Sequence, residues 1–595
     1  MKMPMRSEVK TEDTWDLSLI YKTVEDMEKD VERMKTLTKE TVALYKGRLT
    51  DSDTINKAVD AYQEILRLVT LTTNYTDLAV SVDYYNSENQ TRNDSVSMVA
   101  SSLMSELSFL ESEISELPDA VIKEAAQKST SNRCWLLDLL RKKPHRLSPE
   151  TEKAMAALSP VFRTPYAIYN MAKLADMKFP SFTVDGKEYP LGYSLYEDDY
   201  AYEANTAVRR EAFRVFSEKL KDYENATAAA YNAQVQQEKT IATLRGYDSV
   251  FDYLLSSQKV SRELYDRQID TIMKELAPHM RRYAKVLQKV YGLEKMTYAD
   301  LKLEPDPDYA PVVTKEKCRE FVTKGLSILG EDYVSMVEDA FDQRWFDWAV
   351  NQGKSTGGFC ASPYGKNSYI LLSFTGRMSD IFTVAHELGH AGHFKRANSA
   401  QSIVDTDVSS YFVEAPSTMN ELLMASYLMK SNDDPRFHRW VYSIMVSNTY
   451  YHNFVTHLLE AAYQREVYRL VDKGESVQAE TLSAIMKKVL TEFWGDAVEL
   501  TEGAELTWMR QPHYYMGLYS YTYSAGLTVA TQVSKRIQKE GTPAVEDWKK
   551  VLFAGSTLDP QGLSLLGGVD ISTDAPLRDT IETIGSYITE LEKGL

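Results

Sequence analysis

Two histidines and a glutamate stand at a spacing that can bind and use a metal ion. His386, Glu387 and His390 form the pattern His-Glu-x-x-His. On an α-helix, residues four apart lie one turn apart on the same face, so both imidazoles can hold one ion. Glu387 lies one step round the helix, where its carboxylate can take a proton from a water molecule. The pattern predicts a zinc peptidase with two histidine ligands and a glutamate base.

The surrounding residues favour a buried helix over a surface helix with scattered histidines. Ser379 or Asp380 can cap a helix that begins near Ile381, and apolar side chains follow at positions suited to burial. Gly389 and Gly392 each weaken such a helix by up to about 1 kcal/mol relative to alanine. We therefore expect another backbone or a substrate to approach the helix at these glycines.

A catalytic zinc ion usually has three protein ligands and one open position, so a further ligand is needed. His393 lies about 10 Å from His386 along the helix axis, and we assign it to packing or to support of the ligands. Glu414 lies between apolar residues, just before an expected helix cap at Thr418, where a carboxylate is costly unless paired with a charge or a metal. We predict Glu414 as the third ligand. The competing carboxylates are Asp405, Asp407 and Glu421.

The segment 508–523 supplies candidate hydrogen-bond donors. It contains His513 and five tyrosines in the ten positions 514–523. A phenol or an imidazole can donate to the oxyanion that forms when water adds to a peptide carbonyl. Only one or two of these rings can reach a single oxygen, so most must belong to an aromatic core.

Two separated motifs resemble the thimet oligopeptidase family, and its oligoendopeptidase F branch in particular. The run 376–390 contains the histidine pair, and the segment 412–417 reads Phe-Val-Glu-Ala-Pro-Ser. The elements 14–17, 245–247 and 353–360 also resemble that branch. The similarity therefore extends over nearly the whole chain, and neither main motif departs from the family pattern.

The resemblance implies a fold and a metal site. It implies a mainly α-helical, two-lobed zincin-type metallopeptidase with a deep substrate channel and a small β element beside the zinc helix. One zinc ion per chain would be bound by His386, His390 and Glu414. The expected organisation is an N-terminal helical region, 1–190, forming part of the channel wall, and a catalytic region, 191–595.

The resemblance also implies residues that contact the substrate. A histidine and a tyrosine of the late segment face the substrate carbonyl in the family, and they match His513 and Tyr523 here. The further substrate-binding candidates are Tyr519, Tyr521, Gly357 and Gly358. The spacing alone leaves open which of the three tyrosines reaches the oxyanion.

The expected reaction is hydrolysis of internal bonds in short unfolded peptides. One alternative is a zinc carboxypeptidase or dipeptidyl carboxypeptidase, which needs a cation to hold the terminal carboxylate. An alternative from another class is a catalytically silent peptide-binding protein, against which the intact Glu387 argues. No covalent intermediate is needed, and we interpret Cys360 as a small buried or rim residue rather than an activated nucleophile.

Short apolar and turn-forming segments predict the few strands. The segment 367–374 is the strongest strand candidate, and its edge could receive an extended peptide through main-chain hydrogen bonds, with broad side-chain tolerance. The alternative is a structural hairpin without a ligand. The dipeptide Asp185-Gly186 predicts a second hairpin within 182–191, and the stretch 303–313 is rich in proline.

Composition agrees with a large helical protein and limits its partners. Glycine (26) and proline (19) are scarce for a chain of 595 residues. Apolar residues recur at helical spacing in five long segments: 24–45, 55–78, 96–117, 205–244 and 261–290. The net charge of −18 argues against nucleic acid and anionic membrane as partners. Three cysteines, no signal-peptide pattern at the start and no long apolar run predict a cytoplasmic location. The oligomeric state stays open.

Overall fold

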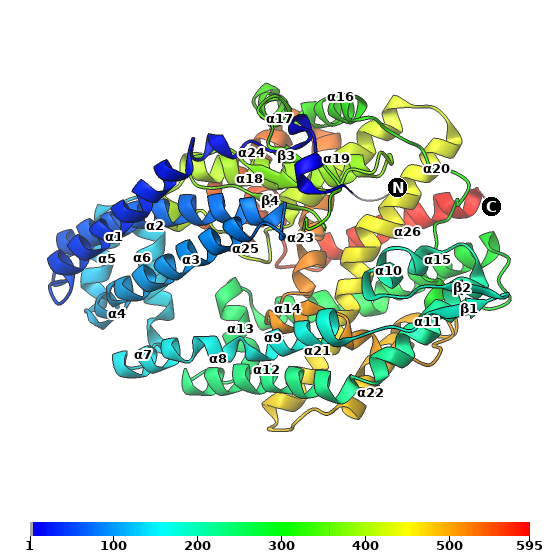
Figure 1. The fold of residues 1–595 in the computed structure, drawn as a ribbon, viewed down its shortest axis with the longest axis horizontal. Helices are drawn as coiled ribbons and strands as arrows, with labels where there is room; N and C mark the ends of the chain where they lie inside the picture. Colours follow the sequence, from blue (N-terminus) through cyan, green and yellow to red (C-terminus); the bar gives the residue numbers. More distant parts are fainter. Residues whose placement is uncertain (1–3, 356, 595) are drawn as a thin grey trace.

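The fold is known from a computed structural model that describes residues 4–355 and 357–594. Helices dominate it, and two small sheets complete it (Figure 1). The helices of the N-terminal third are α1 (Val24–Tyr45), α2 (Ser52–Ser81), α3 (Ser87–Leu107), α4 (Phe109–Glu116), α5 (Asp119–Lys128), α6 (Arg133–Lys142), α7 (Pro149–Ala157), α8 (Ser159–Phe162) and α9 (Thr164–Asn170).

The middle of the chain carries a hairpin and then eight helices. These elements are β1 (Phe182–Val184), β2 (Lys187–Tyr189), α10 (Tyr193–Asp198), α11 (Thr206–Lys221), α12 (Glu224–Leu244), α13 (Val250–Gln258), α14 (Arg262–Thr271), α15 (Ala277–Val290), α16 (Lys315–Leu326) and α17 (Glu331–Asp342). The predicted hairpin is confirmed: Asp185 and Gly186 form its two-residue turn with φ of 51° and 76°, the positive values that such a turn requires.

The described residues of the last part of the chain form a three-stranded sheet and the α-helices α18–α26. Its elements are β3 (Phe346–Asp347), β4 (Phe359–Ala361), β5 (Tyr369–Leu371), α18 (Asp380–Ala400), α19 (Ala415–Ser431), α20 (Pro435–Ile444), α21 (His457–Asp472), α22 (Ala479–Trp494), α23 (Tyr521–Glu540), α24 (Thr542–Ala554), α25 (Pro560–Leu566) and α26 (Ala575–Lys593). A π-helical segment, Met445–Thr456, joins α20 to α21.

The five predicted helical segments are helical, although three of them are divided. The prediction for 24–45 matches α1, whose start is capped because the Thr23 side chain accepts a hydrogen bond from the Asp26 N–H. The segments 96–117 and 205–244 each contain two helices, and a π-helical turn separates α14 from α15. Periodicity alone does not locate such breaks, since the apolar faces continue across them.

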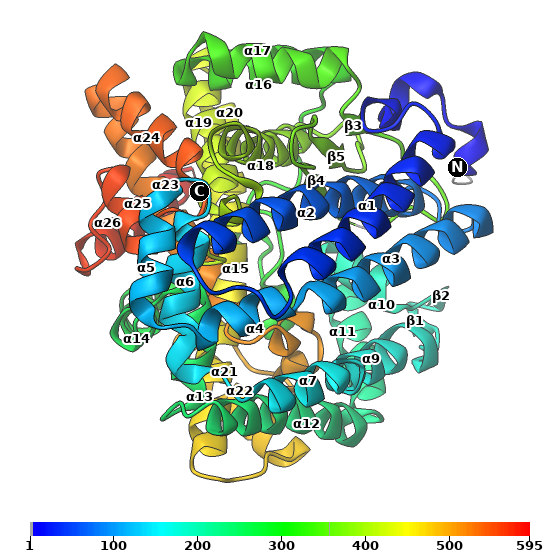
Figure 2. The ribbon, with the colours of Figure 1, turned by 90° about the vertical axis from the view of Figure 1, so that its left-hand side faces the viewer.

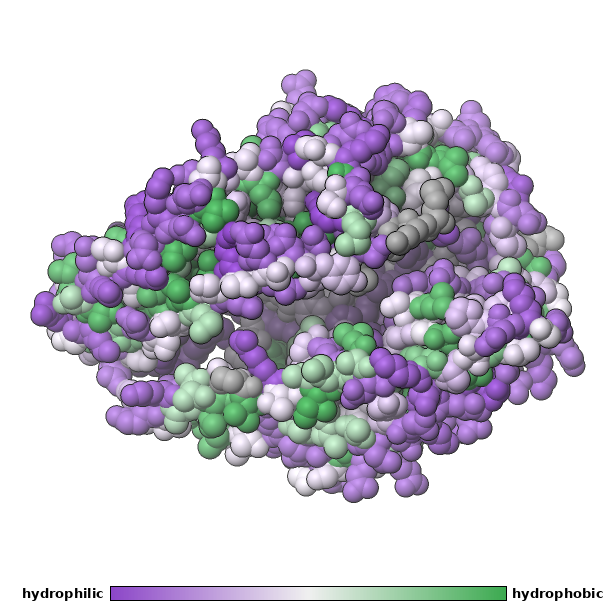
Figure 3. Space-filling view, viewed as in Figure 1, coloured by the Kyte–Doolittle hydropathy of each residue, from purple (hydrophilic) through white to green (hydrophobic). Residues whose placement is uncertain are grey.

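The molecule has two halves with a hollow between them. Figures 1 and 2 place α16–α19 in one half, α12, α21 and α22 in the other, and α1–α4 along one side. The space-filling view is hollowed between the two halves (Figure 3). This arrangement confirms the expected mainly helical, two-lobed fold. One large apolar core extends from Met177 to Leu591, and a separate core lies among α1–α6. The division of the chain at residue 190 stays a prediction.

The prediction that the edge of the 367–374 strand receives substrate is wrong. That segment forms β5, which is fully buried and lies in the middle of the order β3-β5-β4. It pairs in parallel with β3 and antiparallel with β4. Strands β3 and β4 are therefore the two edge strands, and β4 packs next to α18. The pairing joins segments that are distant in the sequence, so the pattern of a single strand could not show which strands lie at the edges of the sheet.

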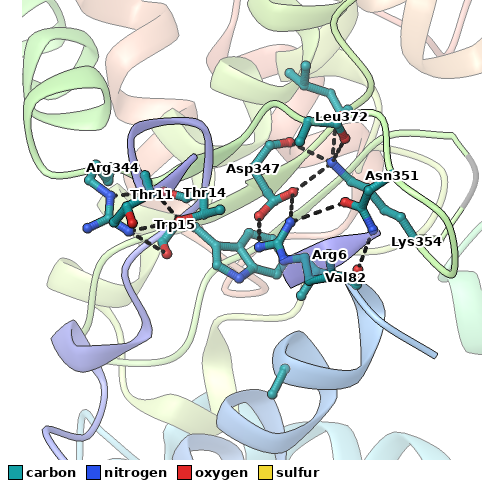
Figure 4. Close-up of polar contacts among 12 residues, drawn as sticks. Arg6, Thr11, Thr14, Trp15, Val82, Arg344, Asp347, Asn351, Lys354 and Leu372 are labelled. Atoms are coloured by element: carbon teal, nitrogen blue, oxygen red, sulfur yellow. Dashed lines mark hydrogen bonds and ion pairs between the residues drawn. The ribbon is translucent and has the colours of Figure 1, made fainter. Parts of the chain in front are cut away.

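The N-terminal segment is attached to this sheet by a buried charge cluster (Figure 4). The Arg6 guanidinium donates to both carboxylate oxygens of Asp347, at 3.0 and 2.5 Å, and Asp347 is fully buried. The Lys354 ammonium donates to the same carboxylate at 2.7 Å and to three backbone carbonyls, including that of Leu372. The cluster thus holds the chain that follows β3 as far as Lys354. No helix within the described ranges is long and apolar enough to cross a membrane.

Candidate active site

The helix that carries the histidine pair packs closely on its neighbours at both predicted glycines. A Cβ atom on Gly389 would lie 2.4 Å from the carbonyl oxygen of Pro416 in α19, and one on Gly392 would lie 2.3 Å from the Tyr333 hydroxyl oxygen. Alanine does not fit at either position without movement of the neighbour. The expected close approach is confirmed, and the approaching groups are protein rather than substrate.

Two predicted helix caps differ from the structure. Helix α18 begins at Asp380 after Ser379, whose side chain makes no capping hydrogen bond. The Asp380 carboxylate instead accepts from the N–H groups of Thr375 and Gly376 and so holds the preceding loop. Helix α19 begins at Ala415, which leaves Thr418 inside the helix with its hydroxyl bonded to the Glu414 carbonyl. Pro416, at the second position of α19, is suited to the first turn of a helix. The helix therefore begins earlier in the chain than the predicted cap at Thr418.

The predicted metal ligands meet where α18 crosses the start of α19. The Nε2 atoms of His386 and His390 lie 3.4 and 3.3 Å from the same oxygen, Oε2 of Glu414. The three ligand atoms all lie within 4.8 Å of one another. Burial raises the pKa of Glu414 and the two imidazoles lower it by more, so the pKa lies well below its usual value. Two nitrogens and one anionic oxygen form a donor set that suits zinc with one open position.

A second carboxylate orients the first histidine. Oε1 of Glu421 lies 2.7 Å from Nδ1 of His386, and the Thr449 hydroxyl donates to the other oxygen of Glu421. A carboxylate on Nδ1 holds the imidazole in the form whose Nε2 lone pair is free for a metal. Glu421, a rival ligand in the sequence, therefore stands behind His386. The other rivals, Asp405 and Asp407, lie outside the group.

Glu387 is buried beside this cluster with an unused oxygen. The residue is 5% exposed, and its Oε2 has no hydrogen-bond partner among the described residues. Burial raises the pKa of Glu387. Gly358 lies close to it, since a Cβ atom there would be 3.1 Å from Oε1 of Glu387. Both residues line a cavity of about 530 Å³ together with the three candidate ligands.

The structure brings one late-segment residue, Tyr523, to this cavity and places His513 beside it. Tyr523, in the first turn of α23, lines the cavity, and its hydroxyl lies 3.3 Å from Nε2 of His513. The Tyr519 ring packs on both residues, with ring centroids 5.4 Å from Tyr523 and 5.7 Å from His513. Tyr521 is fully buried and its hydroxyl donates to Gln258, so the structure does not place it at the site.

Three residues at the site have no counterpart in the sequence predictions. His457 donates through Nδ1 to Oε2 of Glu460 at 2.8 Å, and its Nε2 lies 3.0 Å from Nε2 of His452. Nδ1 of His513 lies 3.6 Å from the same oxygen of Glu460. Burial raises the pKa of Glu460 and the neighbouring imidazoles lower it by more, to about 2. The signal available in the sequence was the spacing of His457 and Glu460, three apart on one helix face.

The remaining candidates lie on the cavity wall or away from it. Cys360 in β4 lines the cavity, and burial raises the pKa of its thiol, which leaves it in the unreactive protonated form. His393 is fully buried and lies outside the candidate ligand group. Gly357 has a φ of 80°, a left-handed conformation that favours glycine.

The comparisons with known proteins define the family. The model of peptidase family M3 matches residues 200–582, and a model described as oligopeptidase F matches residues 113–179. The first match covers more than half of the chain. The protein therefore belongs to peptidase family M3 and is a metallopeptidase, and the resemblance to oligoendopeptidase F is confirmed.

Similar proteins extend over the full length of the chain. Oligopeptidase PepF of Bacillus subtilis is 27% identical over 597 residues, which cover 100% of this chain and 88% of the relative. An oligoendopeptidase F homolog of Borreliella burgdorferi is 25% identical, with 99% of each chain covered. A putative peptidase from Chlamydophila abortus shares the fold with a TM-score of 0.87, 21% identity and complete coverage of both chains. Oligoendopeptidase-F from Enterococcus faecium has a TM-score of 0.74 and 20% identity, over 96% of this chain and 98% of that one.

Proposed function

We propose that this protein is a zinc endopeptidase that hydrolyses internal bonds of short unfolded peptides. The observation that carries the proposal is the convergence of His386, His390 and Glu414 beside the buried, unpartnered carboxylate of Glu387. A carboxylate oxygen without a donor is costly inside a protein unless a ligand or water satisfies it. A water molecule that is about to be deprotonated would do so.

Each residue of the site has a role in this reaction. Zinc held by the two histidines and Glu414 would supply Lewis acidity, which activates water and polarises the peptide carbonyl. Glu387 takes the proton from the attacking water and delivers it to the leaving amine. Tyr523 and His513 donate hydrogen bonds to the oxygen that becomes negatively charged.

The edge strand β4 and the glycines before it are suited to hold the peptide. An extended chain that adds to β4 would be held through main-chain hydrogen bonds, with little dependence on its side chains. Gly358 lies against Glu387, so a side chain there would occupy the space needed by the substrate backbone. The hollow between the two halves would admit short unfolded chains more readily than folded proteins (Figure 3). A cytoplasmic location remains a prediction from the sequence.

Cleavage of an internally quenched peptide, blocked at both ends, tests the proposal. The metal-assayed wild-type enzyme is compared with Glu387→Gln, and mass spectrometry identifies the products. We expect internal cleavage by the wild type and a loss of at least about 10³-fold in kcat for the variant, with one zinc still bound. If the zinc-loaded wild type cleaves no peptide of a varied library, a peptide-binding function replaces this proposal.

A further inference from the structure

A second cavity adjoins the catalytic one and contains a lysine ammonium that has no hydrogen bond or ion pair with any described residue. The cavity has a volume of about 350 Å³ and lies against His513, while His452 lines both cavities. Three basic side chains line it: Lys173, Lys302 and Arg510. Tyr523 and His513, which are hydrogen-bonded to each other, are the proposed donors to the carbonyl of a bound peptide. Because His513 also lines the second cavity, that cavity begins next to the position of this carbonyl.

The charges of this cavity do not balance. Arg510 pairs with Glu197, with a nitrogen–oxygen distance of 2.9 Å. The other carboxylate of the cavity, Glu460, is bonded to His457. Lys173 donates to the backbone carbonyl of Arg510 at 2.8 Å. These contacts leave no carboxylate for the remaining lysine.

Lys302 makes neither a hydrogen bond nor an ion pair with any described residue. Its ammonium lies 4.7 Å from the centre of the Tyr451 ring, a contact that fixes its position without using any of its three N–H donors. An ammonium group in a partly buried cavity is costly without a counter-charge. A mobile anion that enters from the catalytic cavity would supply one.

We propose that Lys302 binds a carboxylate of the peptide substrate, either its C-terminal carboxylate or an acidic side chain. The inference rests on the proposed peptidase function and adds to it a preference for substrate charge. Such a cation beside the site would favour cleavage at a fixed distance from the bound carboxylate. If the bound group is the C-terminal carboxylate, the enzyme would cleave internal bonds at a preferred distance from the C terminus of the peptide.

Matched peptide pairs test the inference and distinguish the two sources of the carboxylate. One pair is N-terminally blocked and differs only in a free or amidated C terminus. A second, fully blocked set replaces glutamine by glutamate at one position at a time. The zinc-loaded wild type, Lys302→Met and Lys173→Met are compared. Lys173→Met removes the same charge from the same cavity but changes a lysine that is already bonded to the backbone.

We expect the wild type to have a KM roughly tenfold lower for one carboxylate-bearing peptide than for its neutral partner, the effect of about one charge-assisted hydrogen bond. Lys302→Met should raise that KM to the value for the neutral partner, whereas Lys173→Met should retain most of the ratio. A ratio that is equal in the wild type and Lys302→Met would overturn the inference, with peptidase activity intact. An equal loss of the KM ratio in Lys302→Met and Lys173→Met would also overturn it, because the preference would then come from the total positive charge of the cavity and not from Lys302.

A measurement on the wild type keeps the inference testable if Lys302→Met does not fold. Burial lowers the pKa of Lys302 to about 8, with Arg510 also lowering it and Glu460 and Glu197 raising it. The preference for the carboxylate peptide should therefore decline as the pH rises through about 8, while the KM of the neutral peptide does not follow this change. A preference that is constant from pH 6 to 9.5 would contradict the role of Lys302.

Binding measurements separate failure of the inference from failure of the proposed function. Isothermal titration calorimetry of Glu387→Gln, alone and combined with Lys302→Met, with the same peptides needs no turnover. If the wild type cleaves nothing, a Kd that still depends on the carboxylate and on Lys302 supports the carboxylate site in a binding protein. If the carboxylate does not change Kd in that variant, the inference fails whatever the activity.

Discussion

The residues of the site show how a buried carboxylate acquires different roles from different neighbours. Glu414 faces two imidazoles and stays ionised, whereas Glu387 has an oxygen without a donor and a raised pKa. Glu460 lies between His457 and His513, and its pKa falls to about 2. Glu414 is therefore suited to hold a cation and Glu387 to accept a proton. Glu460 is suited to fix the position of a histidine.

We predict that Glu460→Gln lowers kcat by roughly tenfold to a hundredfold with little change in KM. The anion that orients His513 is lost, but the histidine itself remains, so the loss should be smaller than the effect of about 10²–10³ from removing an oxyanion donor. Steady-state kinetics with a neutral peptide measure the effect, and circular dichroism checks the fold. Glu466→Gln, on the same helix but paired with Arg469 near the surface, should leave kcat unchanged. An unaltered kcat in Glu460→Gln would contradict this role.

At the scale of elements, the crossing of α18 and α19 decides the geometry of the candidate metal site. Glu414 immediately precedes α19, and the backbone of Pro416 lies against Gly389 of α18. The distance between the two helices thus sets the distance between Glu414 and the histidines. The N-terminal segment acts in a similar way on the small sheet, because Arg6 and Lys354 both pair with Asp347 of β3 (Figure 4).

Gly389→Ala should weaken metal binding and lower stability together. The added methyl group must separate the two helices, which costs about 1–3 kcal/mol and displaces Glu414. Zinc content after dialysis and the Tm of the metal-loaded protein measure both effects. Gly192→Ala is the control, since a Cβ atom there meets only Leu195 at 3.9 Å. Full zinc binding in Gly389→Ala would show that the helices can move apart without cost to the site.

At the scale of the whole molecule, large helical halves provide rigid walls and also bury polar groups at some cost. Glu238 in α12 is 7% exposed and accepts hydrogen bonds from Tyr468 in α21 and from Gln234. Burial raises its pKa from 4.5 to about 7, and the two hydrogen bonds lower it by less. The folded protein therefore holds a proton that the unfolded chain releases between these pH values.

This proton makes stability depend on pH. As the pH rises from 4.5 to about 7, Glu238 binds more protons in the folded state than in the unfolded state, so its contribution to the free energy of unfolding falls by roughly 3 kcal/mol and then stays level. Glu238→Gln should remove this decline, because an amide in either orientation retains hydrogen bonds with both neighbours. The gain in Tm over the wild type should be larger at pH 8 than at pH 5. The exposed Glu263→Gln is the control, and equal gains at both pH values would contradict the prediction.

The sequence by itself determined the chemistry that lies within short segments. Helical spacing placed His386, Glu387 and His390 on one turn, and the cost of burying a carboxylate favoured Glu414 over its rivals as the third ligand. The ends of α1 and the turn at Asp185 followed from local patterns in the same way, because capping and turn geometry depend on a few neighbouring residues.

The tertiary structure alone decided what depends on contacts between distant segments. It placed β5 between the edge strands β3 and β4, paired Glu421 with Nδ1 of His386, and buried Tyr521 in the core. It also placed Lys302 beside a cavity that α10, α21 and the late segment complete. No local pattern carries such information, because strand pairing, pocket walls and charge balance arise only when residues hundreds of positions apart pack together.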